Sequence, residues 1–153
     1  MKKLFLLVMV LTLISCAEPN YREDKKIVIR KVPRVILKLT LSAGANFDFD
    51  KSVLLNKDIP KLNEFIDQIK ELEGTLIIIG HTDTNGSYEY NDKLSMRRAR
   101  AIENYMEERL DFDKYQLEVV GKGEREPIYK LEKSIPEMAA NRRVEITFIE
   151  TNN

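Results

Sequence analysis

The sequence predicts an α+β domain, a two-layer α/β sandwich in which helices pack on one mixed four-stranded sheet. Four short segments are rich in β-branched and apolar residues, and two longer segments carry apolar residues at helical spacing. These segments follow one another in the order β-α-β-α-β-β. The chain has 153 residues, 43% of them hydrophobic and 33% charged, which is the balance of one globular domain.

The first half of the predicted domain contains a strand, a helix and a second strand. Apolar and β-branched residues indicate a strand over 35–41. Asp58 is a suitable cap for a helix whose apolar residues recur at helical spacing over 59–72, and Gly74 is expected to end that helix. The continuous apolar run over 75–79 is typical of a strand that is covered on both faces.

The second half contains the longest helix and two further strands. The spacing of apolar residues predicts a helix over 88–110, followed by a strand over 115–120. The stretch 124–142 is irregular, with a short helix expected after Ser134. Apolar and polar residues then alternate over 144–149, which marks the final strand.

The first 15 residues have the order of a secretory signal. Two lysines precede an apolar run over 4–14, whose eleven residues are too few to span a bilayer. The run ends in Leu13-Ile14-Ser15-Cys16, which resembles the lipobox of bacterial lipoproteins. That resemblance implies cleavage before Cys16 and acylation of the cysteine, and two or three acyl chains give stable membrane anchoring. The alternative is an ordinary signal peptide, or an uncleaved anchor, with an incidental cysteine.

Residues 16–33 are interpreted as the lipidated cysteine and a polar tether, and residues 34–150 as the folded domain. Residues 17–33 reach about 55 Å when fully extended, so the domain would work close to the membrane. Ala17 lacks the aspartate that retains many enteric lipoproteins at the inner membrane, which favours the outer membrane.

Charge and rare residues exclude several partners and chemistries. The 25 Lys and Arg residues equal the 25 Asp and Glu residues, so no overall field favours nucleic acid. Cys16 is the only cysteine, which excludes an intramolecular disulfide, and His81 is the only histidine. We therefore expect neither a metal nor a cofactor.

Four motifs in register carry the main resemblance. Gly-His-Thr-Asp opens the stretch 80–99, Phe-Asp-Phe-Asp-Lys-Ser occupies 47–52, Val-Gly-Lys-Gly-Glu occupies 120–124, and Asn-Arg-Arg-Val-Glu occupies 141–145. Together they are similar to the OmpA-like peptidoglycan-binding domain, the family shared by Pal lipoproteins and MotB. The resemblance covers roughly residues 39–149. It implies the OmpA C-terminal fold and non-covalent binding to the peptidoglycan wall.

The residues themselves also point to a binding site. Asp83 lies in the polar loop 81–87 before the long helix, while Asn91, Leu94 and Arg98 share one face of that helix at spacings of three and four. If the loop folds back over this face, Asp83 and Arg98 meet at one pocket. A carboxylate beside a guanidinium matches a zwitterionic ligand, because the acid accepts an ammonium and the arginine binds a carboxylate.

The resemblance implies a particular ligand and particular roles. In the family, the residues matching Asp83 and Arg98 hold the diaminopimelate side chain of a peptidoglycan stem peptide. Other matching positions line or brace the pocket: Phe49, Asp50, Thr82, Asn91, Leu94 and Arg142. The alternatives are a structural ion pair for Asp83 and Arg98, a core position for Leu94, a turn cap for Asp50 and a loop-orienting role for His81. Lys122 departs from the aromatic residue frequent in the family.

The predicted function is an outer-membrane lipoprotein, on the periplasmic face, that binds diaminopimelate-type stem peptide without catalysis and links membrane to wall. Its partners would be peptidoglycan, outer-membrane lipid through acylated Cys16, and periplasmic envelope proteins. One alternative is a protein-interaction lipoprotein that binds a periplasmic partner, as Pal binds TolB. A second is a metal-dependent wall hydrolase using His81 and Asp83, although zinc catalysis normally needs three protein ligands. No role is assigned to residues 125–140.

Overall fold

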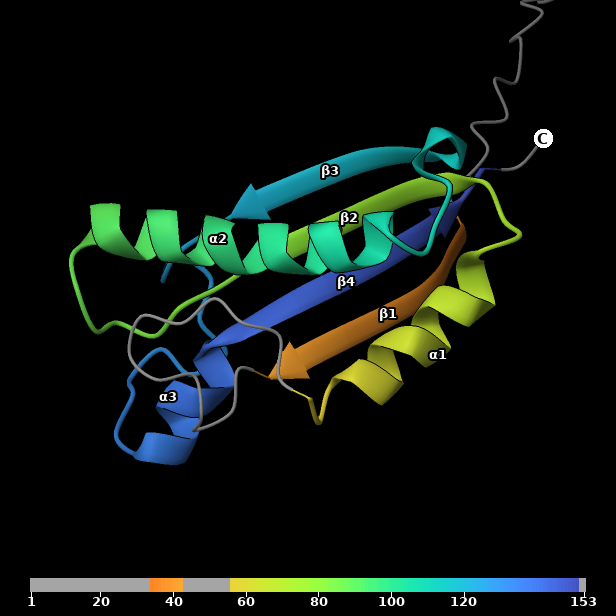
Figure 1. Ribbon diagram of the computed structural model, residues 1–153. Coiled ribbons are helices and arrows are strands. Elements are labelled where there is room, and N and C mark those ends of the chain that lie inside the picture. The colour runs from red at the N-terminus through yellow and green to blue at the C-terminus, as the bar shows by residue number, and fades with distance from the viewer. Residues whose placement is uncertain (1–33, 43–55, 152–153) are drawn as a thin grey trace, which may run out of the picture. The chain divides into compact units, whose positions relative to one another are not determined.

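The computed structural model describes residues 34–42 and 56–151, which belong to one compact unit, Lys31–Asn153 (Figure 1). Several predictions lie outside the described residues. They concern the signal over 1–15, Cys16 and the tether over 16–33, and the candidate site residues Phe49 and Asp50.

Four strands form one mixed sheet, and the α+β class predicted from the sequence is confirmed. The spatial order is β1-β4-β2-β3, in which β2 and β3 are parallel while β4 runs antiparallel to both β1 and β2. The strands are β1 (Arg34–Ser42), β2 (Gly74–Gly80), β3 (Tyr115–Gly121) and β4 (Arg143–Glu150).

The register defines two ends of the sheet, which differ in what they carry. At the entry end, where the chain enters β1, Arg34 and Gly74 both pair with Glu150. At the loop end, Gly80 pairs with both Val144 and Gly121, so β2 and β3 lead into loops where β4 begins.

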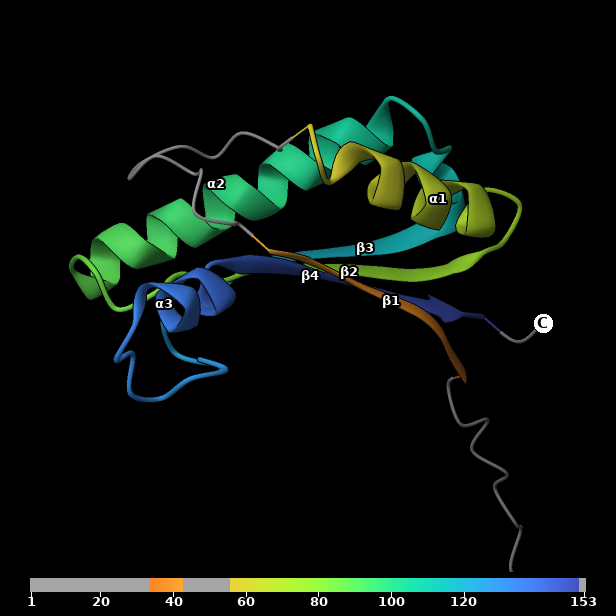
Figure 2. The same cartoon turned by 90° about the horizontal axis from the view of Figure 1, so that it is seen from below.

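Two helices cover one face of the sheet, as Figure 2 shows from below. They are α1 (Ile59–Ile69) and α2 (Tyr88–Glu107); a short 3-10 helix η1 (Phe112–Lys114) precedes β3, and α3 (Ile135–Asn141) precedes β4 at the loop end. Ser134 caps α3 by accepting a hydrogen bond from the backbone of Glu137, which confirms the short helix predicted there. Among the helices of residues 56–151, none is long and apolar enough to cross a membrane.

Three local predictions need correction. Asp58 occupies the N-cap position of α1 but makes no side-chain capping hydrogen bond. The helix ends at Ile69, and Gly74 instead starts β2. A glycine is needed there because a Cβ would lie 2.2 Å from the backbone oxygen of Ile149 in β4. The predicted long helix ends at Glu107 rather than at residue 110.

The strand over 75–79 is fully buried on one face only. Leu76 and Ile78 lie against the helices with no exposed surface, whereas Thr75, Ile77 and Ile79 on the other face are half-buried. Both long helices pack on the same face of the sheet, so the expectation that this strand is covered on both faces was wrong.

The hydrophobic core lies between that face and the two helices. Its fully buried side chains are Leu62 and Ile69 of α1, Ala99 and Met106 of α2, and Leu76, Ile78, Ile146 and Phe148 of the sheet. Gly80 permits the close approach of α2 at the loop end, since a Cβ on it would lie 2.0 Å from the backbone oxygen of Ser95. The first half of α2 is thereby held directly over the end of β2.

Candidate ligand-binding site

The loop between β2 and α2 continues the path of β2 beyond the sheet. The backbone N–H of His81 donates to the oxygen of Arg143 at 2.8 Å, and that of Thr82 donates to the oxygen of Gly123 at 2.9 Å. These two bonds attach the loop to the start of β4 and to the turn after β3. They determine where the next residue, Asp83, lies.

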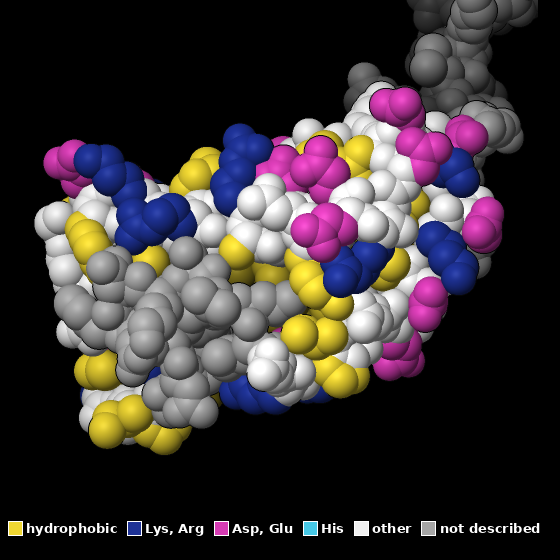
Figure 3. Space-filling view, in the orientation of Figure 1, with side chains coloured by type: hydrophobic (Ala, Val, Ile, Leu, Met, Phe, Trp, Pro, Cys, Tyr) yellow, Lys and Arg dark blue, Asp and Glu magenta, His cyan; other side chains and the backbone are white. Residues whose placement is uncertain are grey.

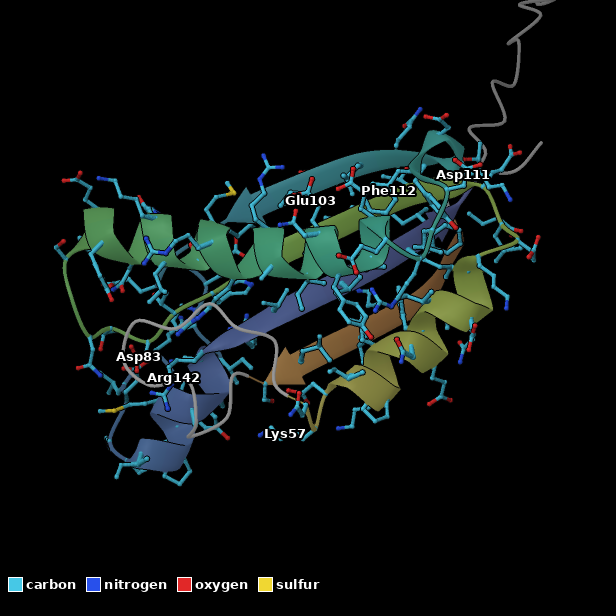
Figure 4. All side chains as sticks on the ribbon, in the orientation of Figure 1. Lys57, Asp83, Glu103, Asp111, Phe112 and Arg142 are labelled. Atoms are coloured by element: carbon cyan, nitrogen blue, oxygen red, sulfur yellow. The ribbon has the colours of Figure 1, made fainter. Side chains whose placement is uncertain are left out.

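The carboxylate of Asp83 is held by Arg142, which directly precedes β4. Arg142 Nη1 donates to Asp83 Oδ2 at 2.5 Å, and only 17% and 9% of the two side chains are exposed. Figure 4 shows the two side chains together where the β2–α2 loop meets α3. Asn85 adds two longer hydrogen bonds to the same carboxylate, both of 3.3 Å. This is a partly desolvated, charge-assisted pair, which is stronger than a surface ion pair.

A second guanidinium reaches the site from α2. Arg98 is only 3% exposed, and its Nη1 donates to the backbone oxygen of His81 at 3.1 Å. Burial lowers the pKa of Arg98 to about 10, the Asp83 carboxylate opposes this shift, and Arg142 adds to it. Arg98 is therefore charged at neutral pH, within electrostatic reach of Asp83 and Arg142.

Two neutral polar side chains complete the floor of the site. Asn91 is fully buried on α2, and its Nδ2 donates to the backbone oxygen of Asp83 at 3.3 Å and to the carboxylate of Glu124. Within the described part of the chain, Asn91 Oδ1, Thr82 Oγ1 and Arg142 Nε are buried without a hydrogen-bond partner. Leaving such an atom unsatisfied costs about 1–3 kcal/mol, so their concentration here favours a polar ligand.

The structure brings together most of the site residues predicted from the sequence. Thr82, Asp83, Asn91, Arg98 and Arg142 all lie at the loop end. Leu94 is buried on α2 but does not belong to the main cluster of core side chains. Reasoning from spacing paired Asp83 with Arg98 and missed its direct contact with Arg142. Asn85 and Glu124 were also missed as site residues, although Glu124 ends the Val-Gly-Lys-Gly-Glu motif over 120–124.

The side chain of His81, the first residue of the β2–α2 loop, is almost fully buried. Burial, followed by the charge of Arg143, lowers its pKa to about 4, so the ring is neutral at pH 7. Its Nε2 lies 3.8 Å from Glu145 Oε1. Nowhere in residues 34–42 and 56–151 do three or more His, Cys, Asp or Glu side chains gather closely enough to hold a metal ion. The site as described is a set of charged and polar hydrogen-bonding groups.

Two features define the class of this domain. One is the mixed sheet with two helices on one face, and the other is the buried Asp83 carboxylate near two guanidinium groups at the loop end of the sheet. This is a small α+β domain whose binding groups come from the β2–α2 loop, α2 and the start of β4. The chain belongs to the OmpA family, whose model matches residues 46–142.

Individual relatives agree with this assignment. Outer membrane protein A of Bordetella avium is 35% identical over 73% of this chain, and the peptidoglycan-associated lipoprotein of Legionella pneumophila is 34% identical over 67%. The chain spans 57% of the length of each of these two relatives. The structure of the cell wall anchor of the T6SS from Pseudomonas aeruginosa superposes with a TM-score of 0.61. That similarity has 25% sequence identity and covers 74% of this chain and 81% of that one.

Proposed function

We propose that this chain is a lipid-anchored outer-membrane protein that binds the peptidoglycan stem peptide without catalysis and so links membrane to wall. The observation that carries the proposal is the Asp83 carboxylate, which is held by the guanidinium group of Arg142 and lies within electrostatic reach of that of Arg98, among buried polar atoms. Membership of the OmpA family, and similarity to a peptidoglycan-associated lipoprotein, support it.

The charges of the site favour a zwitterionic ligand that includes a carboxylate. Besides the carboxylate of Asp83, the site offers the guanidinium groups of Arg142 and Arg98, so a ligand that carries a carboxylate as well as an amine finds a partner for both groups. The end of a diaminopimelate side chain carries an ammonium and a carboxylate. In our proposal the ligand ammonium donates to Asp83, while a guanidinium donates two parallel hydrogen bonds to the ligand carboxylate.

The placement of the site supports a linking role. The chain enters the domain at Arg34, at the entry end, while Asp83 and Arg142 lie at the loop end (Figure 1). The nine residues of β1 separate these ends by about 30 Å. A tether that joins the entry end to a membrane would therefore leave the site free to face the wall.

Binding to purified peptidoglycan tests the wall-binding part. We expect the chain without residues 1–19 to sediment with peptidoglycan sacculi, and free meso-diaminopimelate to compete. Sedimentation without competition would point to the glycan or to nonspecific adsorption, and the absence of sedimentation would refute wall binding.

Acylation of Cys16 is the other half of the proposal, with residues 1–15 as the cleaved signal, 16–33 as the tether and 34–150 as the binding domain. Cys16→Ser should leave an unprocessed precursor that takes up no labelled fatty acid, because only the thiol accepts the diacylglyceryl group. Equal lipid labelling of Cys16→Ser and the unaltered chain would exclude this anchor.

A second candidate function is binding of a periplasmic protein, and a surface feature favours it. Exposed apolar side chains gather in and before α3, at the lower left of Figure 3, and such patches are frequent at protein interfaces. They are Ile128, Tyr129, Leu131 and Ile135. Cross-linking in cells distinguishes this function: Leu131→Ser and Ile135→Ser should remove a partner without affecting sedimentation with sacculi.

A further inference from the structure

The loop that carries Asp83 has a second attachment, on the segment before α3. Both hydrogen-bond donors of Thr84 meet one oxygen of Glu132: the backbone N–H at 3.1 Å and the side-chain hydroxyl at 2.7 Å. Glu132 is 48 residues further along the chain, in a stretch to which the sequence assigns no role. The residue next to the candidate binding carboxylate is thus held from outside its own loop.

Asn141 determines where Glu132 lies. The side chain of Asn141 is fully buried, and its Oδ1 accepts from the backbone N–H groups of Ile128 at 2.8 Å and Tyr129 at 3.0 Å. Its Nδ2 donates to the oxygen of Tyr129 at 2.9 Å and to Glu132 Oε1 at 2.6 Å. The backbone partners fix which end of the amide is the donor, so Glu132 must offer an acceptor to Asn141.

These contacts close a ring around the candidate site. Asn141 is followed directly by Arg142, whose guanidinium binds Asp83, and Asp83 is followed directly by Thr84. The ring runs from Asp83 through Thr84, Glu132, Asn141 and Arg142 and back to Asp83. The loop is therefore held by two routes from the end of α3, one through Arg142 and one through Glu132.

We propose that Glu132 is a positioning residue for the binding site, an inference that rests on the proposed function. It does not touch the ligand: its oxygens accept from Thr84 and Asn141 and keep the Asp83 loop in one conformation. A loop that is already ordered loses less conformational entropy when the ligand binds, so affinity is higher. Thr84 is exposed, so this contact contributes more to the position of the loop than to the stability of the fold.

The chemistry requires a carboxylate at position 132. Glu132 faces donors on both sides, Thr84 on one oxygen and Asn141 on the other. A glutamine has only one acceptor oxygen, so its amide N–H groups would meet a donor on one side. We therefore expect Glu132→Gln to weaken the attachment nearly as much as Glu132→Ala.

The experiment compares Glu132→Ala and Glu132→Gln with the control Glu137→Ala, using the full chain. Glu137 lies five residues away and accepts from the backbone N–H of Lys133 at 2.6 Å, so its removal perturbs the start of α3 without touching Thr84. Binding to purified sacculi should fall by about threefold to tenfold in the two Glu132 variants, the range of one net hydrogen bond. The control should bind like the unaltered chain.

Hydrogen exchange separates positioning from general stability. Peptides covering 81–87 should exchange faster in Glu132→Ala than in Glu137→Ala, while the melting temperatures of the two variants stay similar. The double variant Thr84→Val/Glu132→Ala should lose less binding free energy than the sum of the losses in the two single variants, because both substitutions break the same contact.

Wild-type affinity or unchanged exchange of 81–87 in Glu132→Ala would overturn the proposal, as would equal effects of Glu132→Ala and Glu137→Ala. If the unaltered chain itself fails to bind sacculi, the proposed function is overturned instead. Hydrogen exchange of residues 81–87 then tests the positioning role by itself. Faster exchange only in the Glu132 variants supports that role, and equal exchange in all variants refutes it.

Discussion

The entry end and the loop end of the same sheet bury different kinds of side chain. Towards the entry end, the rings of Tyr115 and Phe148 pack edge-to-face with centroids 6.0 Å apart, above fully buried aliphatic side chains. At the loop end, polar and charged side chains such as Asp83, Asn91 and Arg98 are buried beside apolar ones such as Leu94 and Val144. Burial of apolar surface stabilises the fold, whereas burial of charges costs free energy unless every group finds a partner. The entry end therefore contributes mainly to the stability of the domain, and the loop end carries the candidate binding groups.

This contrast predicts that the largest effect on stability comes from the apolar region. Phe148→Ala should lower the free energy of unfolding by about 3–5 kcal/mol, because it leaves a cavity where no surface is exposed. Urea denaturation measures the loss. The matched control is Leu117→Ala on edge strand β3, where the side chain is 37% exposed and the loss should be about 1 kcal/mol or less. Equal losses would contradict the contrast.

Changes at the loop end should act on binding instead. Asp83→Ala and Arg98→Ala should each abolish sedimentation with sacculi, because they leave a charged ligand group unpaired, a loss of roughly 2–5 kcal/mol of binding free energy. The melting temperature of Asp83→Ala should also fall, because the mostly buried Arg142 loses its carboxylate partner, so binding is compared at a temperature where each variant is folded. Arg98→Lys should also fail largely, since an ammonium cannot make the two-bond fork to a carboxylate.

Arg97→Ala is the control for this pair, because Arg97 is the neighbour of Arg98 on another face of α2. It should bind nearly as well as the unaltered chain. Normal binding by Asp83→Ala and Arg98→Ala, with loss in Arg97→Ala, would show that the site is assigned to the wrong residues.

His81 sharpens the comparison through pH. Its pKa is about 4 in the folded chain and near 6.5 when unfolded, so between these values only the unfolded state binds the proton. Protonation of His81 in the unfolded state therefore lowers the free energy of unfolding as pH falls from 6.5 to 4, by an amount on the order of 3 kcal/mol. Denaturation at both pH values should show a smaller loss in His81→Phe. An identical pH dependence in the two proteins would mean that His81 is not buried in its neutral form.

The smallest expected effect concerns the cap of α2. The hydroxyl of Ser87 accepts from the backbone N–H of Tyr90 at 3.2 Å, and Ser87→Ala should cost about 1 kcal/mol of stability. Binding should be nearly unchanged, since the contacts described for Asp83 are with Asn85, Asn91 and Arg142 and do not involve Ser87. A large loss of binding with unchanged stability would extend the site to the start of the helix.

Parts of the site could be read from the sequence because they are close in the chain. Asn91, Leu94 and Arg98 share a helix face through spacing alone, and Asp83 lies just before that helix. The contact of Asp83 with Arg142 spans 59 residues, and that of Thr84 with Glu132 spans 48. Neither contact can be predicted from local spacing, because each depends on which strands become neighbours in the sheet.

The sequence by itself determined the kind and sequence of the elements, since the periods of side chains in strands and helices are local properties. The segments 35–41, 115–120 and 144–149 are strands as predicted. Only the tertiary structure decided the strand order β1-β4-β2-β3 and the packing of both long helices on one face. Insertion of β4 between β1 and β2 brings Arg142 to Asp83 at the end of β2. The physical reason is that hydrogen bonding between strands joins residues by position in the sheet, whatever their distance along the chain.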